Sequence, residues 1–300
     1  MKGVKNIRKK WYETNLGAIK SSLKDVSNVL RILELRSFIT QERNSWSAPK
    51  SLGNDDIIAC FESLGLLKKV EVPDRYGSTL KNLYVQRSPS AFQVALGLRP
   101  NSYLSHASAA QINNLSRNIH KVIYVTKEQS EKAPVEIELT QESIDQAFKK
   151  PQRVTHDQYV YEDMTLMLLS GKFTGDLGVG AVTSGGDEMR VTRLERTLID
   201  MTVRPDYSGG VYQVLEAYER AVDQLSVAAF MSLLKRIAFI YPYHQAIGFY
   251  MEKAGFPEAT CDRMRSYGLG FDFYLAHAMK EVEYDEKWRL YVPVGMEIAR

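Results

Sequence analysis

The spacing of apolar residues changes within residues 54–85, and this change constrains the fold more than any other feature of the chain. From Ile57 onward, apolar residues recur at steps of three and four, as they do on one face of a helix. Gly65 then offers the left-handed conformation that commonly ends a helix. Residues 69–85 alternate polar with apolar on both sides of a turn. The segment therefore predicts an amphipathic helix followed directly by a β-hairpin.

A helix followed at once by a two-stranded ribbon is the element order of a winged helix-turn-helix, a module that usually binds DNA. Residues 19–38 carry a broad apolar stripe and predict the core helix of this module. A second helix is expected before residue 54, although Pro49 and Gly53 limit its length. We therefore predict an N-terminal winged-helix domain, with a basic N-terminal arm, over residues 1–88.

Positive charge is concentrated at the front of the chain. Residues 1–50 carry eleven Lys or Arg against four Asp or Glu, a net charge of +7, whereas the whole chain has a net charge of +3. Basic side chains that neutralise DNA phosphates release counterions and bind in a salt-dependent way. The alternative is a solvated, partly disordered charged tail with ordinary exposed side chains.

The helix at residues 54–65 is itself a poor candidate for reading bases. Asp55 and Asp56 near its start cap a helix well but repel phosphate. DNA contacts are expected instead in the arm, in the segment before this helix and on the hairpin. The predicted DNA-binding residues are Lys9, Lys10, Arg43, Ser47, Lys50, Ser51, Arg75 and Lys81.

The remaining residues, 89–300, predict a larger mixed α/β domain with a small sheet and several helices, so the whole fold is expected to be α+β. Ser105 is expected to cap a helix that Leu115 closes, and Thr192 and Glu195 have the spacing of a capping box. Strands are predicted at 122–126, 135–139, 159–169 and 288–294, a flexible loop at 175–186, and helices at 211–222, 227–240 and 243–254.

Several classes of function find no support in the sequence. The chain has no run of 18 apolar residues and no apolar stretch of a secretory signal, so we expect a cytoplasmic protein without a membrane partner. Cys60 and Cys261 lie in helical apolar patterns and are expected to be core thiols. The five histidines lack metal-like spacing, and the glycines of residues 175–180 lack the context of a phosphate cradle. We expect neither a metal nor a cofactor.

The chain resembles the AbiEi family of antitoxins. In that family a proline–glutamate pair usually precedes an alanine–leucine–aspartate run, whereas here RLE at 193–195 and TLID at 197–200 stand in its place. The resemblance covers about residues 23–254. It rests on the predicted winged helix, SYLSHASAAQINNL at 102–115, KVIYVT at 121–126, RVTRLERTLIDMTVRP at 190–205 and YHQAIGFYMEKAG at 243–255.

The resemblance implies a non-enzymatic antitoxin and transcriptional autorepressor of a bacterial type IV toxin–antitoxin system, which acts in abortive infection and phage defence. Family members join a winged helix that binds inverted operator repeats in double-stranded DNA to a C-terminal domain that counters a nucleotidyltransferase-like toxin, without a stable complex. By analogy, the motif positions are Ser102, Tyr103, Ser105, Glu195 and Asp200. The alternative is that these five side chains only cap helices and pack.

A toxin-type nucleotidyltransferase is the rival interpretation. Such an enzyme needs carboxylates two residues apart on a strand to hold magnesium, and Glu136 and Glu138 have that spacing. No glycine-rich turn precedes them, and no third strand carboxylate follows. Alternating charge on a half-exposed strand explains the same pattern.

Overall fold

A computed structural model describes residues 2–118, 120–133, 138–184 and 187–296, without the side chains of 2–10, 184 and 187. The fold is mixed α+β, as predicted, with helices and three separate sheets among these residues. None of the helices in these ranges is both long enough and apolar enough to cross a bilayer. The predicted boundary between residues 88 and 89 stays a prediction. The chain divides into two compact units: residues 1–100 with 158–166 and 183–189, and residues 101–157 with 167–182 and 190–300.

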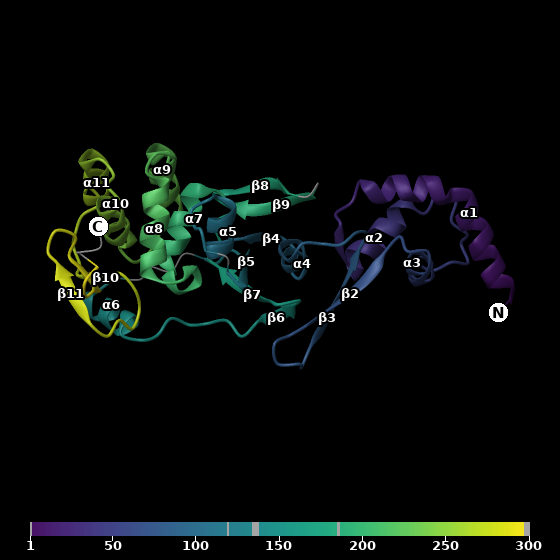
Figure 1. Ribbon diagram of the computed structural model, residues 1–300, viewed down its shortest axis with the longest axis horizontal. Coiled ribbons are helices and arrows are strands. Elements are labelled where there is room, and N and C mark those ends of the chain that lie inside the picture. Colours follow the sequence, from purple (N-terminus) through teal and green to yellow (C-terminus); the bar gives the residue numbers. More distant parts are fainter. Residues whose placement is uncertain (1, 119, 134–137, 185–186, 297–300) are drawn as a thin grey trace. The chain divides into compact units, whose positions relative to one another are not determined.

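The first unit contains the predicted helix and hairpin. Gly65 has a φ of 66° just beyond the helix, as its left-handed role requires. The hairpin strands pair antiparallel, and β1 adds to β3 to give a three-stranded sheet of order β1-β3-β2. The elements, shown in Figure 1, are α1 (Lys2–Lys24), β1 (Val29–Arg31), α2 (Ile32–Glu42), α3 (Asn54–Ser63), β2 (Lys68–Pro73), β3 (Leu80–Val85) and α4 (Ala91–Gly97).

The single helix predicted at residues 19–38 is wrong. The segment is divided between the end of α1, the strand β1 and the start of α2. Val29 and Leu30 belong to the apolar stripe, but they lie opposite Val85 and Tyr84 of β3 in the sheet. Strand pairing therefore overrides the local helical pattern. The basic N-terminal segment is helical, because residues 2–10 form the first turns of α1.

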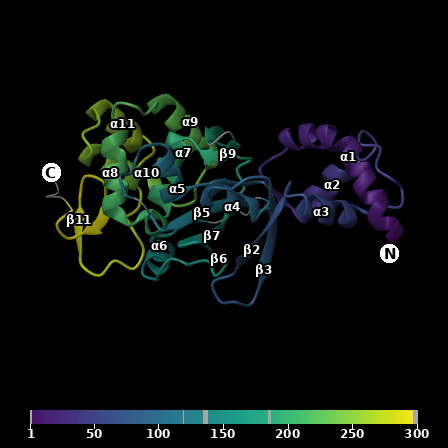
Figure 2. The same ribbon diagram turned by 45° about the vertical axis from the view of Figure 1, so that its right-hand side comes forward.

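Trp46 organises the core of the first unit. Its side chain is fully buried and meets Phe61 of α3 edge to face, with ring centroids 5.8 Å apart. Trp11 of α1 donates its indole N–H to the Trp46 carbonyl at 2.7 Å, and Trp46 donates its own to Ser22 Oγ at 3.2 Å. These contacts fix the turn between α2 and α3 against α1. Figure 2 shows the three helices grouped together.

The central sheet has six strands in the order β6-β7-β5-β4-β9-β8. β5 confirms the strand predicted at 122–126, whereas the strand predicted at 159–169 is two strands joined at Glu162, whose φ is 53°. The loop predicted at 175–186 is confirmed for 175–178 but wrong for 179–184, which form β8. The strands are β4 (Ser102–Leu104), β5 (Val122–Glu128), β6 (Gln158–Tyr161), β7 (Met164–Gly171), β8 (Val179–Ser184) and β9 (Asp187–Thr192).

Helices of the second unit enclose an apolar core that includes Ile199, Tyr218 and Phe249. The three predicted helices between 211 and 254 are present, but α9 ends at Ile237, where Ala238 adopts a left-handed conformation with φ 50°. The elements are α5 (His106–Ile112), α6 (Gln141–Phe148), α7 (Leu194–Val203), the 3₁₀ helix η1 (Pro205–Ser208), α8 (Val211–Ala221), α9 (Val227–Ile237), α10 (Tyr243–Lys253) and α11 (Glu258–Arg265).

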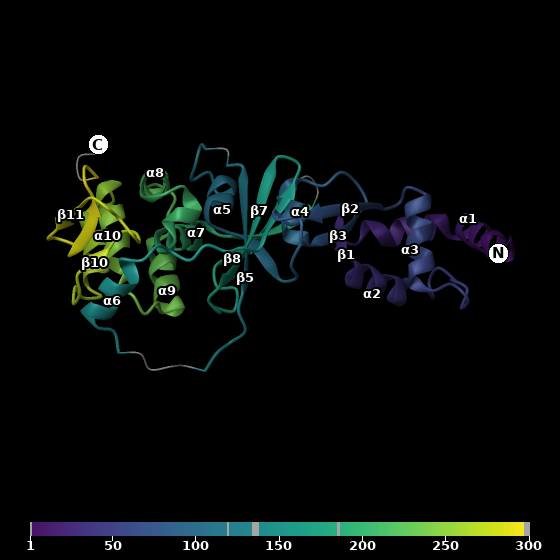
Figure 3. The ribbon, with the colours of Figure 1, turned by 90° about the horizontal axis from the view of Figure 1, so that it is seen from below.

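The final extended piece does not return to the central sheet. It forms a separate three-stranded sheet of order β10-β12-β11, in which β10 and β12 run parallel. This small sheet lies beside α10 and α6 in Figures 1 and 3. Its strands are β10 (Phe273–Tyr274), β11 (Val282–Asp285) and β12 (Leu290–Pro293).

Two predicted helix caps differ from the structure. Ser105 occupies the N-cap position of α5, but its hydroxyl makes no capping hydrogen bond, and α5 ends at Ile112 before Leu115. The cap of α7 is Arg193, one residue later than the predicted Thr192, so Glu195 does not complete a capping box. Both hydroxyls make other contacts instead: Ser105 Oγ lies 2.7 Å from Thr126 Oγ1 of β5, and Thr192 Oγ1 lies 2.8 Å from the side-chain hydroxyl of Thr197 within α7.

Candidate functional site

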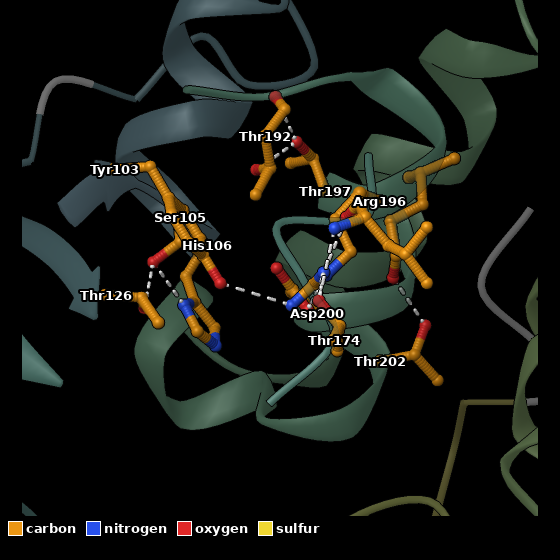
Figure 4. Close-up of polar contacts among 12 residues, drawn as sticks. Tyr103, Ser105, His106, Thr126, Thr174, Thr192, Arg196, Thr197, Asp200 and Thr202 are labelled. Atoms are coloured by element: carbon orange, nitrogen blue, oxygen red, sulfur yellow. Dashed lines mark hydrogen bonds and ion pairs between the residues drawn. The ribbon is translucent and has the colours of Figure 1, made fainter. Parts of the chain in front are cut away.

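A buried polar cluster in the second unit is centred on Arg196 of α7. The guanidinium donates from Nε to Asp200 Oδ1 at 2.7 Å, one helical turn away. Its Nη1 donates to the Leu177 carbonyl at 2.7 Å and to Thr174 Oγ1 at 3.2 Å, while Nη2 donates to Tyr103 Oη at 3.3 Å. Figure 4 shows these side chains converging on the guanidinium. Arg196 thus joins α7 to β4 and to the segment before β8.

Glu128 is the second carboxylate of the cluster. It lies 4.0 Å from Arg196 Nη1 and accepts a hydrogen bond from the Tyr103 hydroxyl at 3.3 Å. The Thr174 hydroxyl donates to Oε1, and the backbone N–H groups of Thr174 and Asp176 donate to Oε2 at 2.7 and 3.3 Å. Glu128 at the end of β5 is therefore held by a tight turn. The cluster has one guanidinium between two carboxylates.

The environment sets the charge of each member. Burial raises the pKa of Glu128, but the hydrogen bonds from Thr174 and Asp176 lower it by more, so this carboxylate stays ionised. Burial lowers the pKa of Arg196, but Asp200 and its other partners raise it above the ordinary value. For Asp200 burial is the largest effect, and its pKa is raised despite the neighbouring guanidinium. Asp200 is thus the carboxylate that takes up a proton more readily.

The backbone at residues 177–178 passes close to Arg196, which places the Leu177 carbonyl where it accepts a hydrogen bond from the guanidinium. Gly178 has a φ of 73°, and a Cβ there would lie 2.7 Å from Cβ of Arg196. Only glycine fits such a position without a shift of the chain. Gly178 lies in the 175–180 segment, which the sequence predicts to be a loop. Its need for glycine comes from the close contact with Arg196, which the local sequence does not indicate.

A cavity of about 210 Å³ lies next to the cluster. His106 forms part of its wall, at the first position of α5, with a left-handed φ of 52°. Its Nδ1 lies 2.9 Å from Ser105 Oγ. Burial, followed by the charges of Arg204 and Arg196, lowers the pKa of His106 to about 3, so the ring is neutral. The other lining residues are Thr126, Leu169, Ser170, Gly171, Lys172, Thr174, Arg196, Asp200, Val203, Arg204, Ile237 and Phe239.

Three of the five predicted motif residues contact this region. Tyr103 and Asp200 contact Arg196 directly, and Ser105 contacts His106. Ser102 is buried in β4, and Glu195 is half-buried in the first turn of α7. No sequence motif singles out the other polar residues of this region, which are Glu128, Thr174, Arg196, His106 and Arg204. The four-residue spacing of Arg196 and Asp200 was the available signal for a pair on one helical face.

The residues predicted to bind DNA are spread over the first unit. Ser47, Lys50 and Ser51 lie together on the turn before α3 and are exposed. Arg43 faces inward from the same turn and donates to the Leu52 carbonyl at 2.8 Å. On the hairpin, Arg75 donates to Gln158 Oε1 at 3.2 Å, and Lys81 donates to the Leu98 carbonyl at 3.1 Å. The side chains of Lys9 and Lys10 lie outside the described part of the chain.

The carboxylates of the rival interpretation are not on a strand that the structure describes. Glu138 is exposed and lies in no helix or strand, while Glu136 falls outside the described residues. Within the described ranges, His, Cys, Asp and Glu do not gather in groups of three or more that could hold a metal ion.

Comparisons with known proteins bear on the fold alone. The chain matches no protein-family model and no curated protein. It is similar to the crystal structure of the RV2827C protein from Mycobacterium tuberculosis, with a TM-score of 0.55 and 13% sequence identity, over 94% of this chain and 91% of that chain. The mixed architecture is therefore shared along nearly the whole chain.

Proposed function

We propose that this chain is a DNA-binding transcriptional autorepressor and the antitoxin of a type IV toxin–antitoxin system, similar to the AbiEi family. One observation carries the DNA-binding part. Helices α2 and α3 are followed directly by a hairpin, and β1 joins this hairpin to make a small antiparallel sheet. This is the element order of a winged helix. The net charge of +7 on residues 1–50 supports binding to a polyanion.

The DNA-facing surface that we propose includes the turn before α3. Asp55 at the start of α3 pairs with Arg36 Nε at 2.9 Å, and Asp56 Oδ2 accepts from the Gly53 N–H at 3.1 Å. These carboxylates stabilise the helix start, and they would repel phosphate there. The exposed residues of the adjacent turn, above all Lys50, carry the contact instead. Operator binding would place the protein in the bacterial cytoplasm.

A binding experiment on the full chain tests this proposal. The probe is a labelled duplex of the chain's own promoter, studied by gel shift at 50 and 150 mM salt beside a scrambled duplex. Specific binding at both salts is expected, and Lys50→Gln should weaken it while Lys280→Gln, an exposed lysine of the second unit, should not. Equal affinity for promoter and scrambled duplexes would remove the repressor proposal.

The antitoxin part is tested by co-expression. Cells that express the nucleotidyltransferase-like protein of the neighbouring gene should grow only when this chain is also produced, and affinity purification should recover no stable complex. Purified chain should transfer no labelled nucleotide to RNA with magnesium present. Transfer that is lost in Glu138→Ala would support the toxin interpretation and contradict ours.

A further inference from the structure

The cavity beside Arg196 has an excess of positive charge. Its wall includes Lys172, Arg196 and Arg204 against the single carboxylate of Asp200. Glu128, which lies behind Arg196, adds one further negative charge. The balance remains positive when both carboxylates are counted. A half-enclosed space keeps such charge effective, because nearby protein limits screening by solvent.

Arg204 forms no direct ion pair with a carboxylate of the described residues, although its positive charge favours ionisation of the nearby Asp200 carboxyl. Arg196 has its charge offset by Asp200 and Glu128, whereas the Arg204 guanidinium makes no hydrogen bond or ion pair with any residue that the structure describes. It lies over the ring of Tyr207, with 5.6 Å between Cζ and the ring centroid. This stacking orients the planar donor group without neutralising it. Arg204 is half-buried, so its guanidinium N–H groups gain from an anion in the cavity that accepts from them.

Lys172 contributes a second charge that neutral groups hold in place. Its ammonium donates to the carbonyls of Ile237 and Ala238, each at 2.7 Å, at the end of α9. Carbonyl oxygens fix the position of the ammonium, but they leave its formal charge in the cavity wall. Lys172 also lies 5.6 Å from the centroid of the Phe239 ring. The two cations are thus both oriented by the fold.

Neutral polar groups complete the wall. His106 is uncharged, its Nδ1 is taken by Ser105, and in Figure 4 its other ring nitrogen makes no drawn contact. Thr126 and Thr174 also line the cavity, with their hydroxyls bonded to Ser105 and Glu128. A strained left-handed backbone at His106 holds its ring in this wall, and such strain is common where a side chain is positioned for a ligand.

We propose that this cavity binds the phosphoryl group of a small ligand, with Arg204 and Lys172 as the charged contacts and His106 Nε2 as a neutral one. A phosphoryl group carries up to two negative charges and matches both the planar guanidinium and the ammonium point charge. The cavity of about 210 Å³ holds several times the volume of one water, about 30 Å³. It therefore has room for more than a single water-sized group.

Calorimetry on the full chain tests this site. Inorganic phosphate, a nucleoside monophosphate and the matching nucleoside are titrated separately in a phosphate-free buffer whose ionic strength is held constant with sodium chloride. We expect saturable binding of the first two, no binding of the nucleoside, and at least a tenfold loss of affinity in Arg204→Gln. Arg236→Gln is the control, since it removes an equal charge from the exposed face of α9.

The two phosphate sources and a folding defect are told apart in the same series. Tighter binding of the monophosphate than of inorganic phosphate identifies an organic phosphate as the ligand class, and equal binding identifies the free anion. A thermal melt checks that each variant folds. Lys172→Gln, at an exposed position, replaces Arg204→Gln if the latter unfolds. Absence of saturable binding, or an equal loss in Arg236→Gln, would overturn the proposal whatever the outcome of the DNA-binding experiments.

Discussion

Arg196 and Arg220 each pair with a carboxylate one helical turn away, but the two pairs differ in burial. The Arg196 and Asp200 side chains are 6% and 10% exposed, against 25% and 33% for Arg220 and Glu216. We therefore expect Arg196→Met to destabilise the second unit by about 3–5 kcal/mol, because it leaves buried carboxylates unpaired. Arg220→Met should cost less than about 1 kcal/mol. Urea unfolding followed by far-UV circular dichroism measures both, and equal losses would contradict this account.

Because His106 is buried in the cavity wall, its protonation should make the free energy of unfolding depend on pH. Its pKa in the folded chain, about 3, lies below the ordinary value of 6.5. Between these values the unfolded chain binds a proton that the folded chain does not. The free energy of unfolding should therefore fall as pH is lowered from about 6.5 toward 3, by at most about 5 kcal/mol from this group.

The measurement that isolates this contribution compares variants across pH. In His106→Asn, which keeps a residue that tolerates the left-handed backbone, part of the decline in unfolding free energy between pH 7 and 4 should disappear. His156→Asn, outside the cavity, should retain the decline of the parent chain. Identical pH profiles for the parent and His106→Asn would show that the ring is not held neutral by its surroundings.

At the scale of elements, apolar spacing predicted the helices and strands whose conformation is set by their own residues. The apolar spacing of α3 and the alternation of the following hairpin appear in the structure because each has its own period and a turn residue such as Gly65. The break between α1 and α2 was not predictable from spacing, since Val29 and Leu30 fit a helical stripe equally well. Their pairing with β3, more than fifty residues later in the sequence, decides their conformation.

The polar cluster around Arg196 shows the same limit of prediction from local sequence. Tyr103 and Asp200 were singled out from sequence, but Glu128 and Thr174 were not, because neither has a motif of its own. They meet Arg196 only through the sheet and the turn before β8. The capping box at Thr192 was wrong because the helix begins one residue later, with Arg193 as its N-cap, and the Thr192 hydroxyl contacts the Thr197 hydroxyl instead of a backbone N–H. Hydrogen bonds between side chains thus compete with backbone capping.

Close packing of α10 gives a prediction for a single helix position. A Cβ at Gly248 would lie 2.1 Å from an atom of the Trp288 ring, so Gly248→Ala requires the ring or the helix to move. We expect a loss of about 3 kcal/mol or more, as for strong overpacking. The matched substitution Gly17→Ala in α1 meets no atom within 4 Å and should stabilise the chain by about 0.5–1 kcal/mol through helix propensity. Thermal melts distinguish the signs, and a gain in both variants would disprove the packing argument.

At the scale of the whole molecule, charge is distributed unevenly along the chain. Residues 1–50 have a net charge of +7, while the full chain has only +3, so the rest is negative by 4. Such a distribution directs a polyanion toward the N-terminal elements and away from the remainder. The proposed phosphoryl cavity does not conflict with this pattern, because its positive balance is local and half-enclosed.

Salt dependence measures how many phosphates the N-terminal elements neutralise. For duplex DNA the logarithm of the binding constant falls with the logarithm of salt concentration by about 0.9 per neutralised phosphate. If Lys50 contacts one phosphate, Lys50→Gln should make the slope shallower by about 0.9, since one fewer counterion is released. Lys280→Gln removes the same charge from the second unit and should leave the slope unchanged. Fluorescence anisotropy with the promoter duplex between 50 and 200 mM salt gives the slopes. Equal changes in the two variants would mean that net charge, rather than a contact before α3, governs binding.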